Sequence, residues 1–108
     1  MTDRELLELA AKAVGIRITE WGEPDYYSHR EGEVAYSGGM EWNPLTDNGD
    51  ALELAVDLGL DIAMHEEKAG AFLLRGGVEA YEPHNDDPYA ATRRAIVRAA
   101  AEIGERRE

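Results

Sequence analysis

The sequence contains no cysteine among its 108 residues. A disulfide framework, a thiolate metal site and a cysteine nucleophile are therefore excluded. Apolar runs are also short, and none approaches the roughly 18 residues that a membrane-spanning helix needs. The segment 1–5 is charged and lacks the apolar region of a signal peptide. These absences favour a protein of the cytoplasm that does not enter a membrane.

Basic residues are scarce in the middle of the chain, which carries the whole net charge of −12. Residues 18–67 hold thirteen acidic side chains and a single basic one, whereas the rest of the chain holds ten of each. An acidic surface repels nucleic acid and anionic lipid and attracts basic partners at low salt. The pattern therefore excludes direct nucleic-acid binding and favours a basic partner, with solubility alone as the simpler explanation.

Motifs for catalysis and metal binding are lacking as well. Asp47, Asn48 and Asp50 form only part of a calcium loop, without its twelve-residue spacing and closing glutamate. The two serines, Ser28 and Ser37, have no nucleophile-elbow sequence around them. We therefore expect neither an enzyme nor a bound metal or cofactor.

What is present suffices for one small domain covering residues 1–108. The hydrophobic fraction of 44% supports one modest core. Helical and alternating apolar patterns predict an α+β fold, with three helices packed on a small antiparallel sheet of three to four strands. The helices are expected at 3–14, 47–58 and from 87 onward, and the strands at 16–21, 60–65, 71–75 and 78–81, with a further short strand at 33–37.

The ends of the helices are marked by local sequence signals. Thr2 and Glu5 have the spacing of a capping box at the start of the first helix. Gly15 and Gly59 supply left-handed stops for the first and second helices. The pair Asp87-Pro88 combines an N-cap with a proline at the first helical position.

Spacing also predicts which side chains are buried. The second helix is expected to bury a stripe of Leu52, Ala55, Val56 and Leu58 with Leu54 beside it. The following strand is expected to turn Leu60, Ile62 and Met64 inward. The third helix is expected to bury Tyr89, Ile96, Val97, Ala100 and Ile103, while its arginines pair with the acidic middle of the chain.

Two candidate binding surfaces follow from these patterns. The first is acidic and consists of Glu53, Asp57, Asp61 and Glu66, whose carboxylates can compete for cations that otherwise hold phosphates. The second is an aromatic pocket, the usual form of a small-molecule or peptide site; its candidate residues are Trp21, Tyr26, Tyr27, Tyr36 and Trp42. The alternative for the aromatic set is that these rings cover a small core, and Trp42 is expected to fill a core position.

Three blocks of sequence resemble a group of short, uncharacterised proteins of tailed bacteriophages and prophages. They are MTDRELLELAAKA at residues 1–13, WNPLTDNGDAL at 42–52 and DPYAATRRAIVRAA at 87–100. The chain is also faintly similar to the NinX-type proteins of lambdoid phages. Residues 21–40 and 62–81 depart from the first of these two groups. The resemblance implies a phage protein that acts in the cytoplasm of an infected bacterium, and it brings no activity with it.

Taken together, these features predict a small acidic bacteriophage accessory protein that binds a host or phage protein. In one version its acidic middle mimics nucleic acid and blocks a basic, nucleic-acid-binding partner. The alternatives are small-molecule or peptide binding in the aromatic pocket, and an assembly role through association of the first helix.

Overall fold

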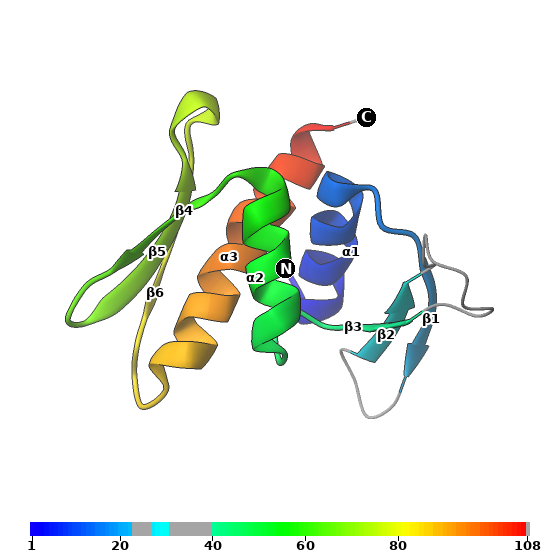
Figure 1. Cartoon of the computed structure of the whole chain (residues 1–108), viewed down its shortest axis with the longest axis horizontal. Helices are drawn as coiled ribbons and strands as arrows, with labels where there is room; N and C mark the ends of the chain where they lie inside the picture. The colour runs from blue at the N-terminus through cyan, green and yellow to red at the C-terminus, as the bar shows by residue number, and fades with distance from the viewer. Residues whose placement is uncertain (23–26, 31–39, 108) are drawn as a thin grey trace.

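A computed structural model describes residues 1–22, 27–30 and 40–107 of the chain. Ten elements follow one another along it (Figure 1). They are α1 (Asp3–Val14), β1 (Ile18–Gly22), β2 (Tyr27–Arg30), β3 (Met40–Trp42), α2 (Asn48–Leu58), β4 (Asp61–Met64), β5 (Lys68–Leu73), the 3₁₀ turn η1 (Leu74–Gly76), β6 (Val78–Pro83) and α3 (Pro88–Arg106).

The three helices lie in the centre of the molecule, between two small sheets (Figure 1). One antiparallel sheet has the order β4-β5-β6 and the other β1-β2-β3. The predicted α+β fold, with three helices packed on a small antiparallel sheet, is confirmed. The second sheet was not predicted as such, and the short strand expected at 33–37 lies outside the described residues.

The predicted helix caps are confirmed. The Thr2 hydroxyl accepts from the Glu5 amide at 3.1 Å, and the Glu5 carboxylate accepts from the Thr2 amide at 3.1 Å. The left-handed residues Gly15 and Gly59, with φ of 74° and 68°, end α1 and α2. Asp87 caps α3 by accepting from two amides of its first turn. Local sequence thus sets where each helix begins.

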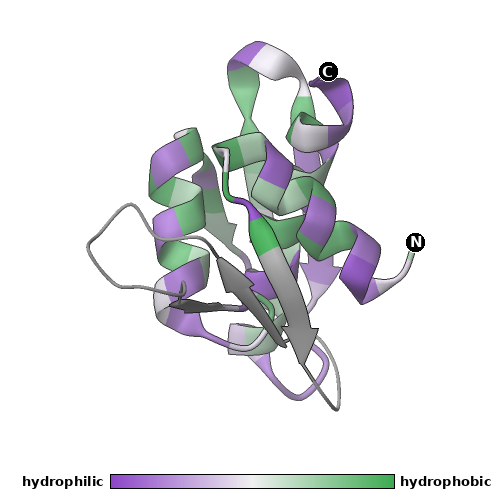
Figure 2. Cartoon of the chain, turned by 90° about the vertical axis from the view of Figure 1, so that its right-hand side faces the viewer, coloured by the Kyte–Doolittle hydropathy of each residue, from purple (hydrophilic) through white to green (hydrophobic). Residues whose placement is uncertain are grey.

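Helix α3 is the centre of the packing, because it contacts α1, α2, β5 and β6. Its buried face is rich in alanine, and small side chains let neighbouring backbones approach closely. At Gly104 the approach leaves no room for a side chain, since a Cβ there would lie 1.9 Å from the Leu9 carbonyl oxygen. Hydrophobic positions of the helices turn toward one another and hydrophilic positions turn outward (Figure 2).

The sheet β4-β5-β6 covers α3 with the small side chains of its two later strands. Ala69, Ala71, Val78 and Ala80 are all buried. The strand predicted at 71–75 is wrong in extent, because β5 begins at residue 68 and ends at residue 73. Residues 69 and 71 are needed in the strand, where they pack on the helix.

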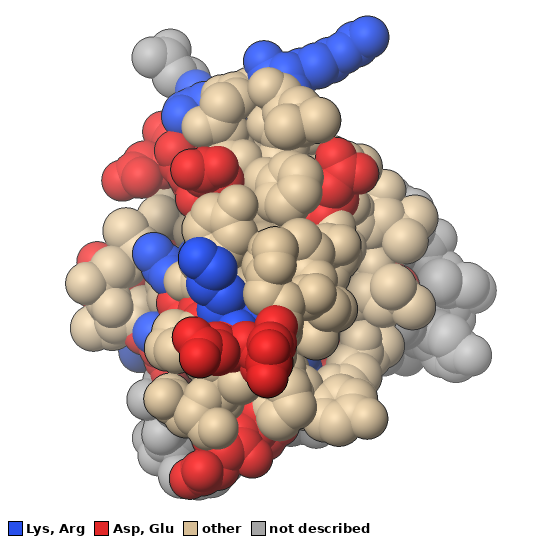
Figure 3. All heavy atoms as spheres, turned by 90° about the vertical axis from the view of Figure 1, so that its left-hand side faces the viewer, with Lys and Arg blue, Asp and Glu red and all other residues tan. Residues whose placement is uncertain are grey.

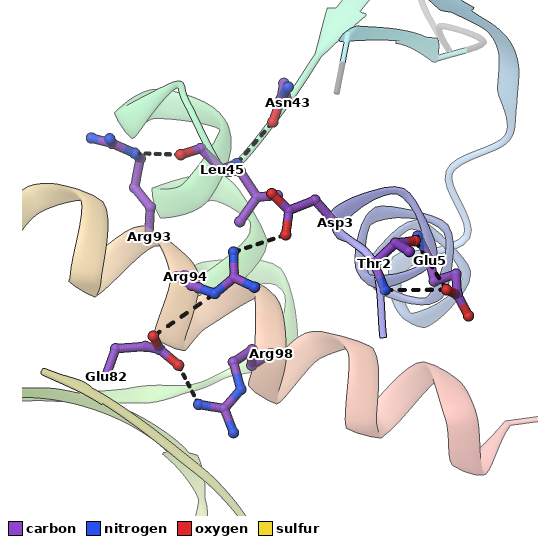
Figure 4. A network of polar contacts seen from close by, with 9 residues as sticks. All are labelled: Thr2, Asp3, Glu5, Asn43, Leu45, Glu82, Arg93, Arg94 and Arg98. Atoms are coloured by element: carbon purple, nitrogen blue, oxygen red, sulfur yellow. Dashed lines mark hydrogen bonds and ion pairs between the residues drawn. The ribbon is translucent and has the colours of Figure 1, made fainter. Parts of the chain in front are cut away.

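Arginines of α3 tie the elements together (Figure 4). Arg94 contacts Asp3 of α1 at 2.9 Å and Glu82 of β6 at 3.8 Å, and Arg98 also pairs with Glu82. These pairs are partly exposed and each contributes at most about 1 kcal/mol. Pairing with acidic residues of the segment 18–67 was predicted for these arginines. The carboxylates that they contact, Asp3, Glu82 and Glu102, lie outside that segment.

Candidate binding groove

An open apolar groove of about 550 Å³ lies where α2, β4 and α3 meet. Helix α3 forms its floor, and α2 and β4 diverge as its walls from their short connection at Gly59 and Leu60 (Figure 1). Its volume is within the usual range for ligand sites, about 300–1,000 Å³. The lining residues are Asn48, Ala51, Leu52, Ala55, Ile62, Met64, Pro88, Tyr89, Thr92, Arg93 and Ile96.

The wall from α2 exists because this helix is rotated from its predicted orientation. Leu52 and Val56 were expected in the core but are 64% and 69% exposed. The side chains that α2 buries are Ala51, Leu54 and Ala55. The two alanines allow α2 to lie close to α3, and this rotation leaves the larger side chains Leu52 and Val56 uncovered.

Strand β4 forms a wall of the groove because it extends past the edge of α3, the helix that packs on this sheet. Ile62 pairs with Ala71 and Met64 with Ala69, so both side chains point to the helical side of the sheet, as predicted. Helix α3 packs on β5 and β6 and touches β4 only at its edge, where the Thr92 hydroxyl lies 3.5 Å from the Met64 sulfur; Ile62 and Met64 stay 39% and 59% exposed. The expectation that they are buried is therefore wrong.

The first turn of α3 closes one end of the groove. Tyr89 was predicted to face the core, but it is 69% exposed and lines the groove together with Pro88. This turn extends beyond the buried part of α3, whose first buried residue is Ala91. The prediction was wrong because helical spacing alone does not show where the packing partner of a helix ends.

The polar side chains of the groove floor already bond within the protein. Arg93 donates from Nε to the Leu45 carbonyl at 2.8 Å and from a terminal nitrogen to the Asn48 side chain at 2.7 Å. Thr92 donates from its hydroxyl to the Pro88 carbonyl at 2.7 Å. What the groove offers an incoming molecule is therefore mainly apolar surface.

Acidic residues lie at both ends of β4, although alternation places the Asp61 side chain on the outer face of the sheet. Asp61 precedes Ile62, and Glu66 and Glu67 follow Met64 in the turn toward β5. The amide of His84 donates to the Glu67 carbonyl at 2.8 Å, which holds the exit loop with Asp86 and Asp87 at the same end as that turn. These acidic residues are all exposed.

The cation nearest to these carboxylates in sequence, Lys68, turns away from the groove. Its position in β5 alternates with the buried residues Ala69 and Ala71, so its side chain lies on the outer face of the sheet. There its ammonium group lies 4.9 Å from the centre of the Tyr81 ring. Lys68 therefore does not bring a cation into the groove lining.

The four residues of the predicted acidic surface are all exposed, but they belong to three different elements. Glu53 and Asp57 lie on the side of α2 opposite the groove, because successive helical residues turn by about 100°. Asp61 lies in β4 and Glu66 in the turn that follows. On the side of the molecule shown in Figure 3, charged groups are small and separated by uncharged surface.

Of the predicted aromatic pocket, the structure describes the side chain of Trp42 alone. Trp42 is 2% exposed and belongs to the core, as the simpler alternative had it. A side chain buried to this degree does not line an open pocket. Tyr26 and Tyr36 lie outside the described residues, and Trp21 and Tyr27 are placed by their backbone in β1 and β2.

Among the described residues, no group of three or more metal-ligating side chains converges. None of the helices in that part of the chain combines the length and apolarity needed to cross a bilayer. Comparison with protein families, with curated proteins and with solved structures gives no match. A function for this chain is therefore inferred from its own sequence and structure.

Proposed function

We propose that this chain is a small binding protein that holds a protein partner in the groove between α2, β4 and α3. Its work is recognition and not catalysis. The phage origin and the bacterial cytoplasm belong to the same proposal and rest on the sequence resemblance. A host or phage protein is then the partner.

One observation carries the proposal: large apolar side chains from three elements are exposed side by side around one hollow. Leu52, Met64 and Tyr89 are each more than half exposed, and Ile62, which is 39% exposed, lines the same groove. Exposed apolar surface gathered at one place on a soluble protein often marks a site of interaction. Aromatic and methionine side chains are also enriched at protein interfaces.

A second candidate is favoured by the segregation of charge. Thirteen acidic residues against one basic residue in the segment 18–67 supply the carboxylates of a nucleic-acid mimic. In this version Glu53, Asp57, Asp61 and Glu66 bind the cations of a nucleic-acid-binding protein. The apolar groove then has no role in binding.

Capture from a bacterial host lysate distinguishes these two functions. The tagged chain is compared with a groove variant, Leu52→Gln with Ile62→Thr, and with an acidic-surface variant in which the four carboxylates become amides. Each is washed at about 50 and about 500 mM salt, a range over which the screening length falls steeply. All substituted side chains are exposed, and unfolding curves check that each variant keeps the fold.

Binding in the groove predicts a partner that survives both washes, is lost with the groove variant and is retained by the acidic-surface variant. A groove variant that captures the partner as well as the natural chain contradicts the proposal. Loss at high salt and with the acidic-surface variant supports nucleic-acid mimicry instead. If the natural chain captures nothing, protein binding is contradicted and the small-molecule or peptide alternative gains weight.

A further inference from the structure

The β4 wall of the groove is also the free edge of a sheet. Among the described strands, β4 pairs with β5 alone. The His65 amide donates to the Lys68 carbonyl at 2.9 Å, which fixes the alternation of this antiparallel ladder. Asp61 and Ala63 therefore bond toward β5, whereas Ile62 and Met64 direct their N–H and C=O groups outward.

The same two residues thus offer side chains to the groove and backbone groups to the edge. A strand placed beside β4 would lie about 4.8 Å from it and bond to Ile62 and Met64. Every second side chain of that strand would then point to the helical side, into the groove. One added strand uses both features at once.

The relation of the sheet to the helices shows what such a strand would cover. Strands β5 and β6 pack on α3, and α2 lies beyond the β4 edge with Leu52 and Val56 exposed (Figure 1). A fourth strand at the β4 edge would extend the sheet toward α2 and shield these side chains from water. The layer formed by α2 and α3 together is thus wider than the sheet β4-β5-β6.

The charges at the two ends of β4 select the occupant. Asp61 lies at one end with its side chain on the outer face of the sheet, and Glu66, Glu67, Asp86 and Asp87 lie at the other end. Basic side chains on both sides of an apolar stretch would match them. A second copy of this chain matches them poorly, because each copy carries a net charge of −12.

We infer that the groove takes an extended segment of a partner protein, which adds a fourth strand at β4, inserts alternate apolar side chains and places Lys or Arg beyond each end. This inference rests on the proposed function and specifies the chemistry of the partner. Main-chain hydrogen bonds provide affinity in such strand addition, and the side-chain pockets provide specificity.

The test uses a synthetic peptide, Lys-Lys-Thr-Val-Thr-Val-Thr-Val-Lys-Lys, with a fluorescent label at its N-terminus. Anisotropy measures its binding to the whole chain, and amide hydrogen exchange locates it. We expect binding to slow exchange at Ile62 and Met64. The amides of Asp61 and Ala63 already bond to β5 and should change little.

Two matched controls isolate the backbone contacts. Met64→Pro removes the outward N–H without touching the bonds to β5, and proline is tolerated at such edge positions; Met64→Ala keeps the N–H and truncates the same side chain. We expect the proline variant to bind at least about tenfold more weakly than the alanine variant. Methylation of the peptide amides that face β4 makes the same test without changing the protein.

The outcomes separate this inference from the function on which it rests. Slowed exchange at Ile62 and Met64, together with weak binding of a peptide with glutamate in place of lysine, supports strand addition. Equal binding of the methylated peptide, or preference for a helical peptide, overturns it, even if lysate capture still depends on the groove. Protection of the same amides that depends on chain concentration without peptide would assign the edge to a second copy and also overturn it.

Discussion

At the residue scale, the clearest local device is the capping box at the start of α1. The pKa of the Glu5 carboxyl lies below its ordinary value of 4.5, chiefly because the ionised group accepts a hydrogen bond from the Thr2 backbone amide and, second, one from the Thr2 hydroxyl. Folding therefore favours the ionised form of Glu5. The stability that it contributes is present above the ordinary pKa and is lost as the pH falls through the lowered one.

This linkage makes a prediction about pH. Urea unfolding of the natural chain and of Glu5→Gln is compared between about pH 6 and about pH 3, across the ordinary carboxyl range. A glutamine amide keeps the box geometry but does not titrate. The natural chain should be the more stable at the upper end of this range, and the difference should shrink as the pH falls.

A matched control is Glu8→Gln, which removes a charge from the same helix outside the capping box. A difference that stays constant with pH for Glu5→Gln, or that changes equally for both variants, would contradict the role assigned to this carboxylate.

At the element scale, sequence predicted where helices begin and end but not how α2 is rotated. Capping depends on residues within one turn, so local sequence was enough to place this helix, which Asp47 caps and Gly59 ends. Its large apolar residues fall in two arcs, with Leu52 and Val56 in one and Leu54 and Leu58 in the other. Which arc is buried depends on the alanines that meet α3, and spacing within α2 does not contain that information.

The groove was missed for the same reason. Ile62 and Met64 were assigned to the correct face of their strand, because alternation fixes the face. Their exposure depends on the width of the helix behind the sheet, which is a tertiary property. The two apolar arcs of α2 were the signal in the sequence for an exposed apolar surface. A helix that packs on one side only needs a single apolar arc.

A pair of substitutions tests the rotation of α2. Leu54 is 2% exposed and Leu52 is 64% exposed, although they are two residues apart in the same helix. Leu54→Ala should lower the free energy of unfolding by about 2–5 kcal/mol, the usual effect of truncating a buried leucine. Leu52→Ala should change it by less than about 1 kcal/mol, since alanine also favours the helix.

Denaturant unfolding of both variants measures this difference. Equal losses of stability, or a larger loss for Leu52→Ala, would show that the arc with Leu52 and Val56 is buried. The groove would then lack one of its walls.

At the scale of the whole molecule, the apolar groove and the acidic residues have different roles in binding. The groove between α2, β4 and α3 has a defined shape and offers both apolar side chains and backbone hydrogen-bonding groups. The acidic residues favour partners that carry positive charge, because charge around an interface governs encounter and choice of partner more than affinity. The groove therefore binds the partner segment, and the acidic residues at the ends of β4 favour a segment with basic residues beyond each end.

Photo-crosslinking in the bacterial host can locate the surface of this chain that binds the partner. A photoreactive amino acid replaces Leu52 in the groove or, in a matched chain, Asp57 on the opposite side of α2, and adducts are resolved by size. The account predicts a discrete adduct with a partner from position 52 and little or none from position 57. The same adduct from position 57 at equal or greater yield would contradict the account and place the binding surface on the acidic side of the helix.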